Sequence, residues 1–225
     1  MRKVLTIAFA LATLALLASC GGGSGKPADG AAGVTRYPVG VVIEKSGALE
    51  NWGDASEKGM RLAVEDLKGK DGIEIELFIE DNKSTPDQSA NAFISLVNVK
   101  NVLVVAGAVA SSNTRAMKEQ ANKLKVPLIT HASTNVQLTK DTEWLYRVCW
   151  NDAFQGAVVA NFALDNQKAK KAAIVTDAAQ DYSRGLSKNF RETYEKRGGK
   201  VVEELTYQTG DKVFTSQVEK LKAMD

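Results

Sequence analysis

The sequence predicts an α/β fold of two doubly wound parallel-sheet lobes joined by a hinge, with the second lobe incomplete. From Tyr37 onward, short apolar runs alternate with segments of helical spacing, which is typical of parallel strands covered by helices. A polar, irregular stretch at residues 132–143 interrupts this alternation, which then resumes. About three strand–helix units fit into residues 171–225, fewer than a doubly wound sheet usually needs.

The first lobe, residues 37–147, contains four predicted strands separated by three helices. Each strand is a short apolar or alternating run, and each helix has apolar residues three or four positions apart. The first helix shows this spacing with Met60, Val64 and Leu67. We expect strands at residues 38–43, 73–79, 102–106 and 127–130, and helices at residues 55–67, 86–97 and 112–124.

The partial second lobe, residues 148–225, follows a short strand at residues 144–150, with the crossing near residues 147–152. Its helices are marked by apolar and aromatic residues at helical spacing, and a glycine pair ends one of them. The helices are indicated by Phe154, Val158 and Phe162, by Tyr182, Leu186, Phe190 and Tyr194, and by residues 213–224; the strands are expected at residues 172–175 and 201–207.

The N-terminus predicts export and lipid anchoring. Arg2 and Lys3 precede an apolar run at residues 4–18 that is short for a membrane span, so residues 1–19 are interpreted as a signal peptide. The segment that ends at Cys20 resembles the bacterial lipobox, in which the cysteine is acylated and becomes the mature N-terminus. An ordinary signal or a membrane anchor that contains a cysteine is the alternative. Residues 20–36 are rich in small residues and indicate a flexible linker.

Composition argues against several function classes. The formal charge of +2 matches the contribution of Arg2 and Lys3, so the mature domain is near neutral and no nucleic-acid partner is expected. Without Cys20, Cys149 has no partner for a disulfide, and its apolar neighbours suggest a buried thiol. His131 is the only histidine. No catalytic residue, metal site or cofactor is predicted, and we expect a monomer.

The candidate site lies where ligands bind in open α/β sheets, outside the carboxyl ends of the strands. Four predicted loops reach that edge, at residues 46–54, 107–114, 130–135 and 177–182. They carry hydroxyl, backbone and aromatic groups suited to a small polar ligand. The candidate ligand-binding residues in them are Trp52, Ser111, Ser112, Ala132, Ser133, Thr134 and Tyr182.

Each of these residues has two interpretations. Free N–H groups at the helix start near Ser111 suit a ligand carboxylate, but Ser112 or Asn113 could instead cap that helix. The segment from Ala132 to Thr134 could accept protons of an ammonium group or could be an ordinary polar turn. Trp52, expected in a glycine-containing loop, and Tyr182 could enclose an apolar group or pack on their own lobes.

Residues 37–225 resemble the type 1 periplasmic binding proteins of ABC importers, especially the branched-chain amino acid (leucine/isoleucine/valine) group. The resemblance rests on the order and spacing of several short motifs. These are residues 39–42, Trp52-Gly53-Asp54, residues 59–64, Glu80-Asp81-Asn82, residues 107–114, Ala132-Ser133-Thr134-Asn135, Arg147, Asp152 with Gln155-Gly156, and Asp181-Tyr182-Ser183.

The resemblance implies roles for several of these residues. Ser111 and Thr134 would receive the ligand α-carboxylate, while the Ala132 carbonyl and the Thr134 hydroxyl would meet the α-amino group. Trp52 would cover the ligand and Tyr182 would close from the second lobe. The family's acidic partner of the ammonium would lie beyond residue 225. Ala110 stands where the leucine-type proteins carry a disulfide cysteine.

The function that follows is capture of an amino acid by hinge closure and delivery to an ABC permease. The protein would be extracytoplasmic, in the periplasm or on the outer face of the cell membrane, and held to the membrane by acylated Cys20. The alternatives are a ligand-sensing receptor domain or a binder of short amides or urea. An envelope enzyme is disfavoured, because the sequence has no Gly-x-Ser-x-Gly or His-Glu-x-x-His motif.

Overall fold

The computed structural model describes residues 35–224. The predicted signal peptide, the lipidation of Cys20 and most of the predicted linker therefore lie outside the described residues. The first strand, β1 (Thr35–Ile43), begins two residues inside the segment expected to be linker.

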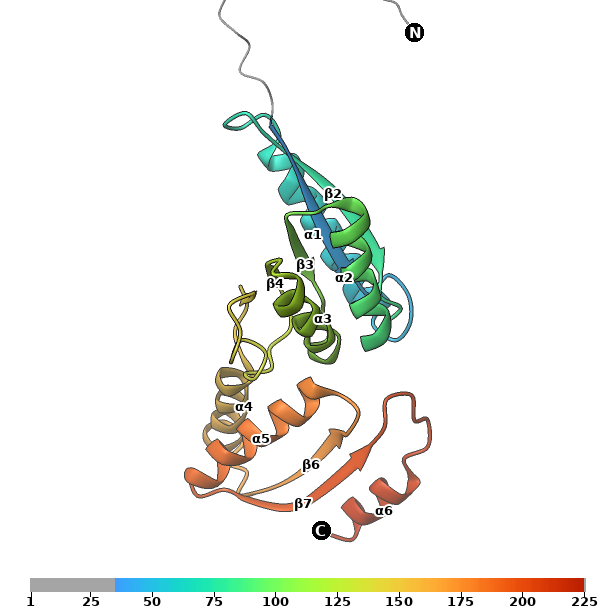
Figure 1. Ribbon diagram of the computed structural model, residues 1–225. Helices are drawn as coiled ribbons and strands as arrows, with labels where there is room; N and C mark the ends of the chain where they lie inside the picture. Colours follow the sequence, from blue (N-terminus) through green and yellow to red (C-terminus); the bar gives the residue numbers. More distant parts are fainter. Residues whose placement is uncertain (1–34, 225) are drawn as a thin grey trace, which may run out of the picture. The chain divides into compact units, whose positions relative to one another are not determined.

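Five strands form the first sheet (Figure 1). The other four are β2 (Ile73–Asp81), β3 (Val104–Gly107), β4 (Leu128–Thr130) and β5 (Leu145–Arg147). All neighbours pair in parallel in the order β2-β1-β3-β4-β5, so the carboxyl ends of the strands share one edge. The central strand β1 ends in the fully buried run Val41, Val42 and Ile43, as expected for a strand covered on both faces.

Three helices accompany this sheet, and together they form the first lobe. They are α1 (Glu50–Leu67), α2 (Pro86–Lys100) and α3 (Ser111–Leu124). Because the crossovers of parallel strands are right-handed, the reversal of strand order after β2 puts α2 and α3 on the face opposite α1. Phe93, Leu96 and Met117 pack fully buried in the core under α2 and α3, each contributing about 1.5–3 kcal/mol of burial free energy.

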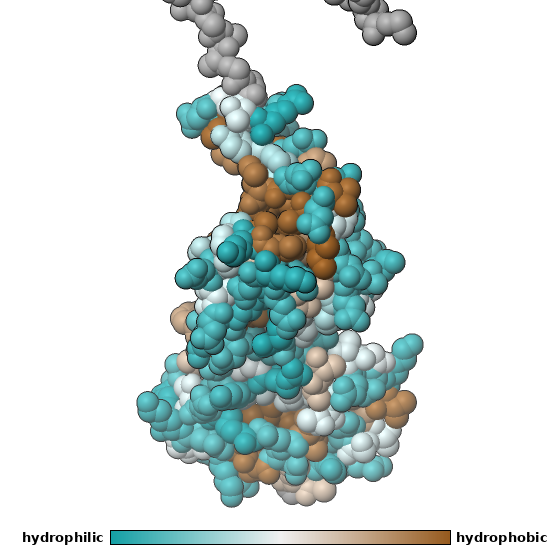
Figure 2. All heavy atoms as spheres, in the orientation of Figure 1, coloured by the Kyte–Doolittle hydropathy of each residue, from teal (hydrophilic) through white to brown (hydrophobic). Residues whose placement is uncertain are grey.

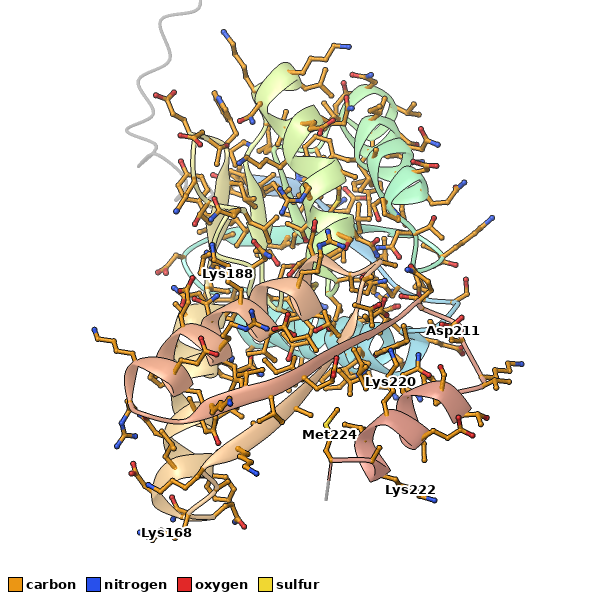
Figure 3. The ribbon with its side chains drawn as sticks, turned by 90° about the horizontal axis from the view of Figure 1, so that it is seen from below. Lys168, Lys188, Asp211, Lys220, Lys222 and Met224 are labelled. Carbon is orange, nitrogen blue, oxygen red and sulfur yellow. The ribbon has the colours of Figure 1, made fainter. Side chains whose placement is uncertain are left out.

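The second lobe is smaller. Strands β6 (Lys171–Asp177) and β7 (Lys200–Tyr207) form a two-stranded parallel sheet, accompanied by α4 (Asp152–Asp165), α5 (Asp181–Lys196) and α6 (Thr215–Lys222). Its core contains Ala160, Leu164 and Tyr194, from α4 and α5. Figure 3 shows α6, with Lys220 and Lys222, to one side of the two strands and away from α5.

Helix α4 packs through small residues and not through its aromatic stripe. A Cβ atom built on Gly156 would lie 2.6 Å from the backbone nitrogen of Phe190, so α4 and α5 approach closely at this point. Phe154 and Phe162, which marked this helix in the sequence, are exposed. Figure 2 shows a further hydrophobic surface around the end of α2 and the start of β3, where Val99 and Leu103 are exposed.

The α/β class and the predicted order of strands and helices are confirmed in the described residues. The prediction that Trp52 lies in a loop is wrong, because α1 begins at Glu50. The connection between β1 and α1 is short, and two hydrogen bonds fix Ser46 within it. The Ser46 hydroxyl donates to Asp81 Oδ2 at 2.6 Å, and the Ser46 carbonyl accepts from Ser84 Oγ at 2.8 Å. The strand expected at residues 144–150 is regular only in β5, since its partner β4 ends at Thr130.

Candidate functional site

A pocket of about 590 Å³ lies at the carboxyl ends of the strands and has walls from both lobes. Five of the seven candidate residues line it: Trp52, Ser111, Ala132, Thr134 and Tyr182. Ser112 and Ser133 are not among its lining residues. The structure therefore brings most of the sequence-predicted site together in one crevice.

The start of helix α3 forms one wall. Its N-cap is Ala110, which offers no side chain to the first turn, so the N–H groups of that turn receive no hydrogen bond from a capping side chain. Neither alternative capping residue acts as one. Asn113 donates its side-chain amide to Glu44 Oε1 at 2.8 Å, and Ser112 faces the second lobe. This geometry suits an anionic group of a ligand near Ser111.

Glu44 fixes the loop that leads into α3. Its fully buried carboxylate accepts the backbone N–H groups of Val109 at 3.0 Å and of Ala110 at 3.1 Å. Gly107 allows the same loop to pass β1, because a Cβ atom at this residue would lie 2.0 Å from the Val42 carbonyl oxygen. Sequence reasoning missed Glu44; its signal was an acidic residue directly after a fully apolar strand.

The segment after β4 forms a second wall, and Ser133 braces it. The Ser133 hydroxyl lies 2.7 Å from the Thr114 hydroxyl and 3.0 Å from the Ala108 carbonyl oxygen, which explains why it does not line the pocket. The neighbouring Thr134 hydroxyl is buried and has no hydrogen-bond partner among the described residues. Buried hydroxyls are normally paired, so this oxygen is available to a ligand.

Aromatic side chains close the pocket from both lobes. Trp52 is 66% exposed, so it does not pack into the core of its own lobe. Tyr182, at the start of α5, accepts a 2.9 Å hydrogen bond on its hydroxyl from Gln155 Nε2. Trp150, in the segment that crosses between the lobes, also lines the pocket and was not predicted. Its position within the expected crossing at residues 147–152 was the signal that could have identified it.

The charges in the pocket are few. No lysine or arginine is among its described lining residues, and Asp177 supplies a carboxylate whose Oδ2 accepts from the Thr209 hydroxyl at 2.5 Å. Burial lowers the pKa of His131, so this ring is neutral at neutral pH. Its Nε2 lies 2.8 Å from the Ser56 hydroxyl. A ligand anion would thus depend on backbone N–H groups and hydroxyls for its stabilisation.

Cys149 lines the pocket as a weakly acidic thiol. Burial raises its pKa, and its Sγ lies 3.8 Å from the Ser133 carbonyl oxygen, so the residue lacks the thiolate character of a nucleophile. Within residues 35–224, histidine, cysteine and acidic side chains form no cluster of three that could hold a metal ion. None of the helices in the same range combines the length and apolarity needed to span a membrane.

Comparison with known proteins finds similar bacterial amino acid binding proteins. An amino acid binding protein of Pseudomonas aeruginosa is 30% identical over 192 residues, which are 82% of this chain and 50% of that protein. The crystal structure of a leucine binding protein, LivK, from Thermotoga maritima matches with a TM-score of 0.80 and 34% identity, covering 83% of this chain and 53% of the other.

A second structure is of the branched-chain amino acid transporter substrate binding protein LivJ from Streptococcus pneumoniae, in complex with isoleucine. It matches with a TM-score of 0.78 and 36% identity, over 85% of this chain and 55% of that one. The chain spans about half the length of the curated relatives it matches. A family model described as periplasmic binding protein matches residues 36–225, so the chain belongs to the periplasmic binding proteins.

Proposed function

We propose that this protein is the lipid-anchored solute-binding component of an ABC importer, which captures a branched-chain or similar amino acid by hinge closure. The observation that carries the proposal is the unpartnered, buried Thr134 hydroxyl beside an uncapped helix start in a pocket walled by both lobes. The named relatives, which bind leucine or isoleucine, support this ligand class.

The ligand α-carboxylate would lie at the start of α3, where it meets Ser111 and the free N–H groups of the first turn. The Thr134 hydroxyl would add a directed hydrogen bond, and the Ala132 carbonyl would accept from the α-ammonium. Hydrogen bonds to charged groups contribute about 1.5–3 kcal/mol each, so the loss of any one of these contacts should weaken binding measurably. Trp52 and Tyr182 would cover the side chain.

Closure around the ligand would exclude water and give a form that a permease can recognise. Such closure requires that the ligand bind the closed form more tightly than the open one. Contacts from both lobes, here Ser111 from the first and Tyr182 from the second, provide that difference because only closure brings them onto the same ligand. The chemistry of the pocket supports binding and not turnover.

Calorimetry on the protein tests the ligand class. L-leucine, L-isoleucine and L-valine are titrated into the wild type, into Ser111→Ala and Thr134→Val, and into the control Ser216→Ala, which changes an exposed serine of α6. We expect the two pocket variants to bind at least about tenfold more weakly, because each loses a hydrogen bond to a charged group. Equal affinity in all four proteins, or no heat with any amino acid, amide or urea, contradicts the proposal.

The anchor and the delivery step need separate measurements. Acylation of Cys20 predicts a mature N-terminus at that residue, with the mass of the attached chains, and release of Cys20→Ser from the membrane fraction. Delivery predicts that cells lacking the protein lose uptake of labelled L-leucine and regain it with the wild type but not with Thr134→Val. Unchanged uptake in the deletion strain would favour a sensing role.

A further inference from the structure

Asp181, the first residue of α5, is held by first-lobe residues through both its backbone and its side chain. We propose that Asp181, Ser112 and Arg115 form a latch that stabilises the closed arrangement of the lobes and so sets how tightly the pocket holds its ligand. This inference rests on the proposed capture of a solute by closure. It gives Ser112 a role across the lobe boundary in place of a contact with the ligand.

The backbone contacts define the geometry. The Asp181 N–H donates to Ser112 Oγ at 2.9 Å, and the Asp181 carbonyl accepts from Asn135 Nδ2 at 2.7 Å. Ser112 lies in the first turn of α3 and Asn135 lies in the segment after β4, so the two contacts come from different parts of the first lobe. Two bonds on one peptide segment fix the start of α5 against the first lobe in position and direction.

The side chain of Asp181 adds two ion pairs to these backbone contacts. Its carboxylate oxygens pair with different arginines: Oδ2 pairs with Arg115 of α3 in the first lobe, and Oδ1 pairs with Arg184 of α5 itself. The Asp181 side chain is 11% exposed and that of Arg115 is 41% exposed, so the pair is partly shielded from water and salt. In this group, the single negative charge of Asp181 is shared by the two positive charges of Arg115 and Arg184.

A further hydrogen-bond chain continues into the second lobe. The Ser112 hydroxyl lies 3.3 Å from Gln180 Oε1, and Gln180 Nε2 donates to the Thr209 hydroxyl at 3.0 Å. Gln180 and Thr209 both line the pocket. The latch is therefore continuous with the pocket wall of the second lobe.

The latch adjoins the pocket residues in sequence as well. Ser112 follows Ser111, and Asp181 precedes Tyr182, so forming the Ser112–Asp181 bond brings those two pocket residues to facing walls. None of the three latch residues lines the pocket. The latch should therefore change the affinity for every ligand by the same factor, whatever side chain the ligand carries.

The test uses Asp181→Asn and Arg115→Gln, which remove the two halves of the interlobe ion pair. The matched control is Asp165→Asn, because the Asp165–Arg197 pair has similar chemistry but lies within the second lobe. Fluorescent amino acids in place of the exposed Lys123 and Lys188 report the distance between lobes by single-molecule energy transfer, with and without L-leucine. Circular dichroism melting establishes that each variant is folded.

We expect both latch variants to shift the ligand-free distance distribution toward longer distances, and the control to match the wild type. L-leucine should dissociate about three- to tenfold faster from both, the range expected for a half-exposed charge pair. L-isoleucine and L-valine should show the same factor. Arg115 lies on α3, so its variant separates the latch from any effect of Asp181 on the start of α5.

The outcomes separate this inference from the proposed function. If the wild type binds no amino acid, the ligand-free distances still test the latch, because they need no ligand. If the wild type binds L-leucine but the distances and dissociation rates of both variants equal those of the control, the latch is rejected. A change in one ligand's affinity alone would also reject it, because it would indicate direct contact.

Discussion

The fully buried Glu44 carboxylate accepts a 3.1 Å hydrogen bond from the backbone N–H of Ala110, the residue that precedes helix α3. The end of β1 therefore sets the position of the helix start that carries Ser111. Because Glu44 is fully buried and directly follows the buried end of β1, this wall of the pocket is formed before any ligand arrives.

Glu44→Ala should lower the free energy of unfolding by about 3–5 kcal/mol, because it leaves three N–H donors, one buried and two partly buried, without their acceptor. Glu44→Gln keeps one side-chain oxygen and should lose less. Urea unfolding measures both, with Glu119→Ala on the exposed side of α3 as the control. A loss for Glu44→Ala no larger than that of the control would show that the loop does not depend on this carboxylate.

Thr134→Val should leave the stability of the ligand-free protein unchanged within about 1 kcal/mol, because the hydroxyl it removes makes no hydrogen bond among the described residues and is only close to the Asp152 carboxyl. Its main effect should appear in ligand binding. Thr130→Val is the matched control: the Thr130 hydroxyl donates to the Ala108 carbonyl at 3.1 Å and accepts from the Ser133 N–H at 3.0 Å. The control should lower the unfolding free energy by about 1–3 kcal/mol. The reverse order of the two stabilities would contradict this account of Thr134.

The sequence was sufficient to predict the order of elements and the edge of the sheet that carries the pocket. Apolar runs and helical spacing report burial directly, and parallel strands bring the following loops to one edge. The sequence could not show at which residue a helix begins, and therefore which side chains of its first turn face the pocket. Ser111 and Ser112 are about 100° apart on α3, so an uncertainty of one residue in the start exchanges a pocket residue for one that faces the other lobe.

Contacts across the lobes could not be predicted for a similar reason. The pairing of Arg115 with Asp181 joins residues 66 positions apart, and nothing local in either segment indicates the other. The exposed aromatic residues of α4 show that a correctly predicted helix can still have the wrong predicted buried face. Helical spacing identified the helix correctly, but the close approach at Gly156, which decides its packed face, depends on α5.

Gly185→Ala should destabilise the junction of the two lobes. A Cβ atom at this residue of α5 would lie 2.3 Å from Asp152 Oδ2 and 2.7 Å from Asn135 Nδ2, and Asp152 is fully buried with little room to move. We expect a loss of about 1–3 kcal/mol in the free energy of unfolding, together with weaker L-leucine binding.

The control for this substitution is Gly59→Ala on α1, where a Cβ atom would meet nothing within 4 Å. Alanine is the better helix former, so this variant should be more stable than the wild type by about 0.5–1 kcal/mol. Chemical unfolding of both variants gives the comparison. Equal effects of the two substitutions would mean that Gly185 is not tightly enclosed.

Asp152, between Thr134 and Gly185, should make the stability of the protein depend on pH. Burial raises its pKa above the ordinary value of 3.8, although the Arg147 guanidinium and the nearby Thr134 hydroxyl, which lies outside hydrogen-bond geometry, oppose the change. Above 3.8 the unfolded chain loses this proton while the folded protein keeps it, so the contribution of Asp152 to stability falls as the pH rises toward the raised pKa.

Asp152→Asn removes this titration. The stability of this variant relative to the wild type should therefore increase as the pH rises from 3.8 to the raised pKa of Asp152, and the difference should be constant at higher pH. Asp165 provides the opposite case, because its hydrogen bonds with Arg197 lower its pKa and its contribution is lost as the pH falls. Urea unfolding of the wild type, Asp152→Asn and Asp165→Asn from about pH 3 to about pH 8 measures how the stability of each protein depends on pH. A difference between Asp152→Asn and the wild type that stayed constant over this range would show that the buried carboxyl keeps its ordinary pKa.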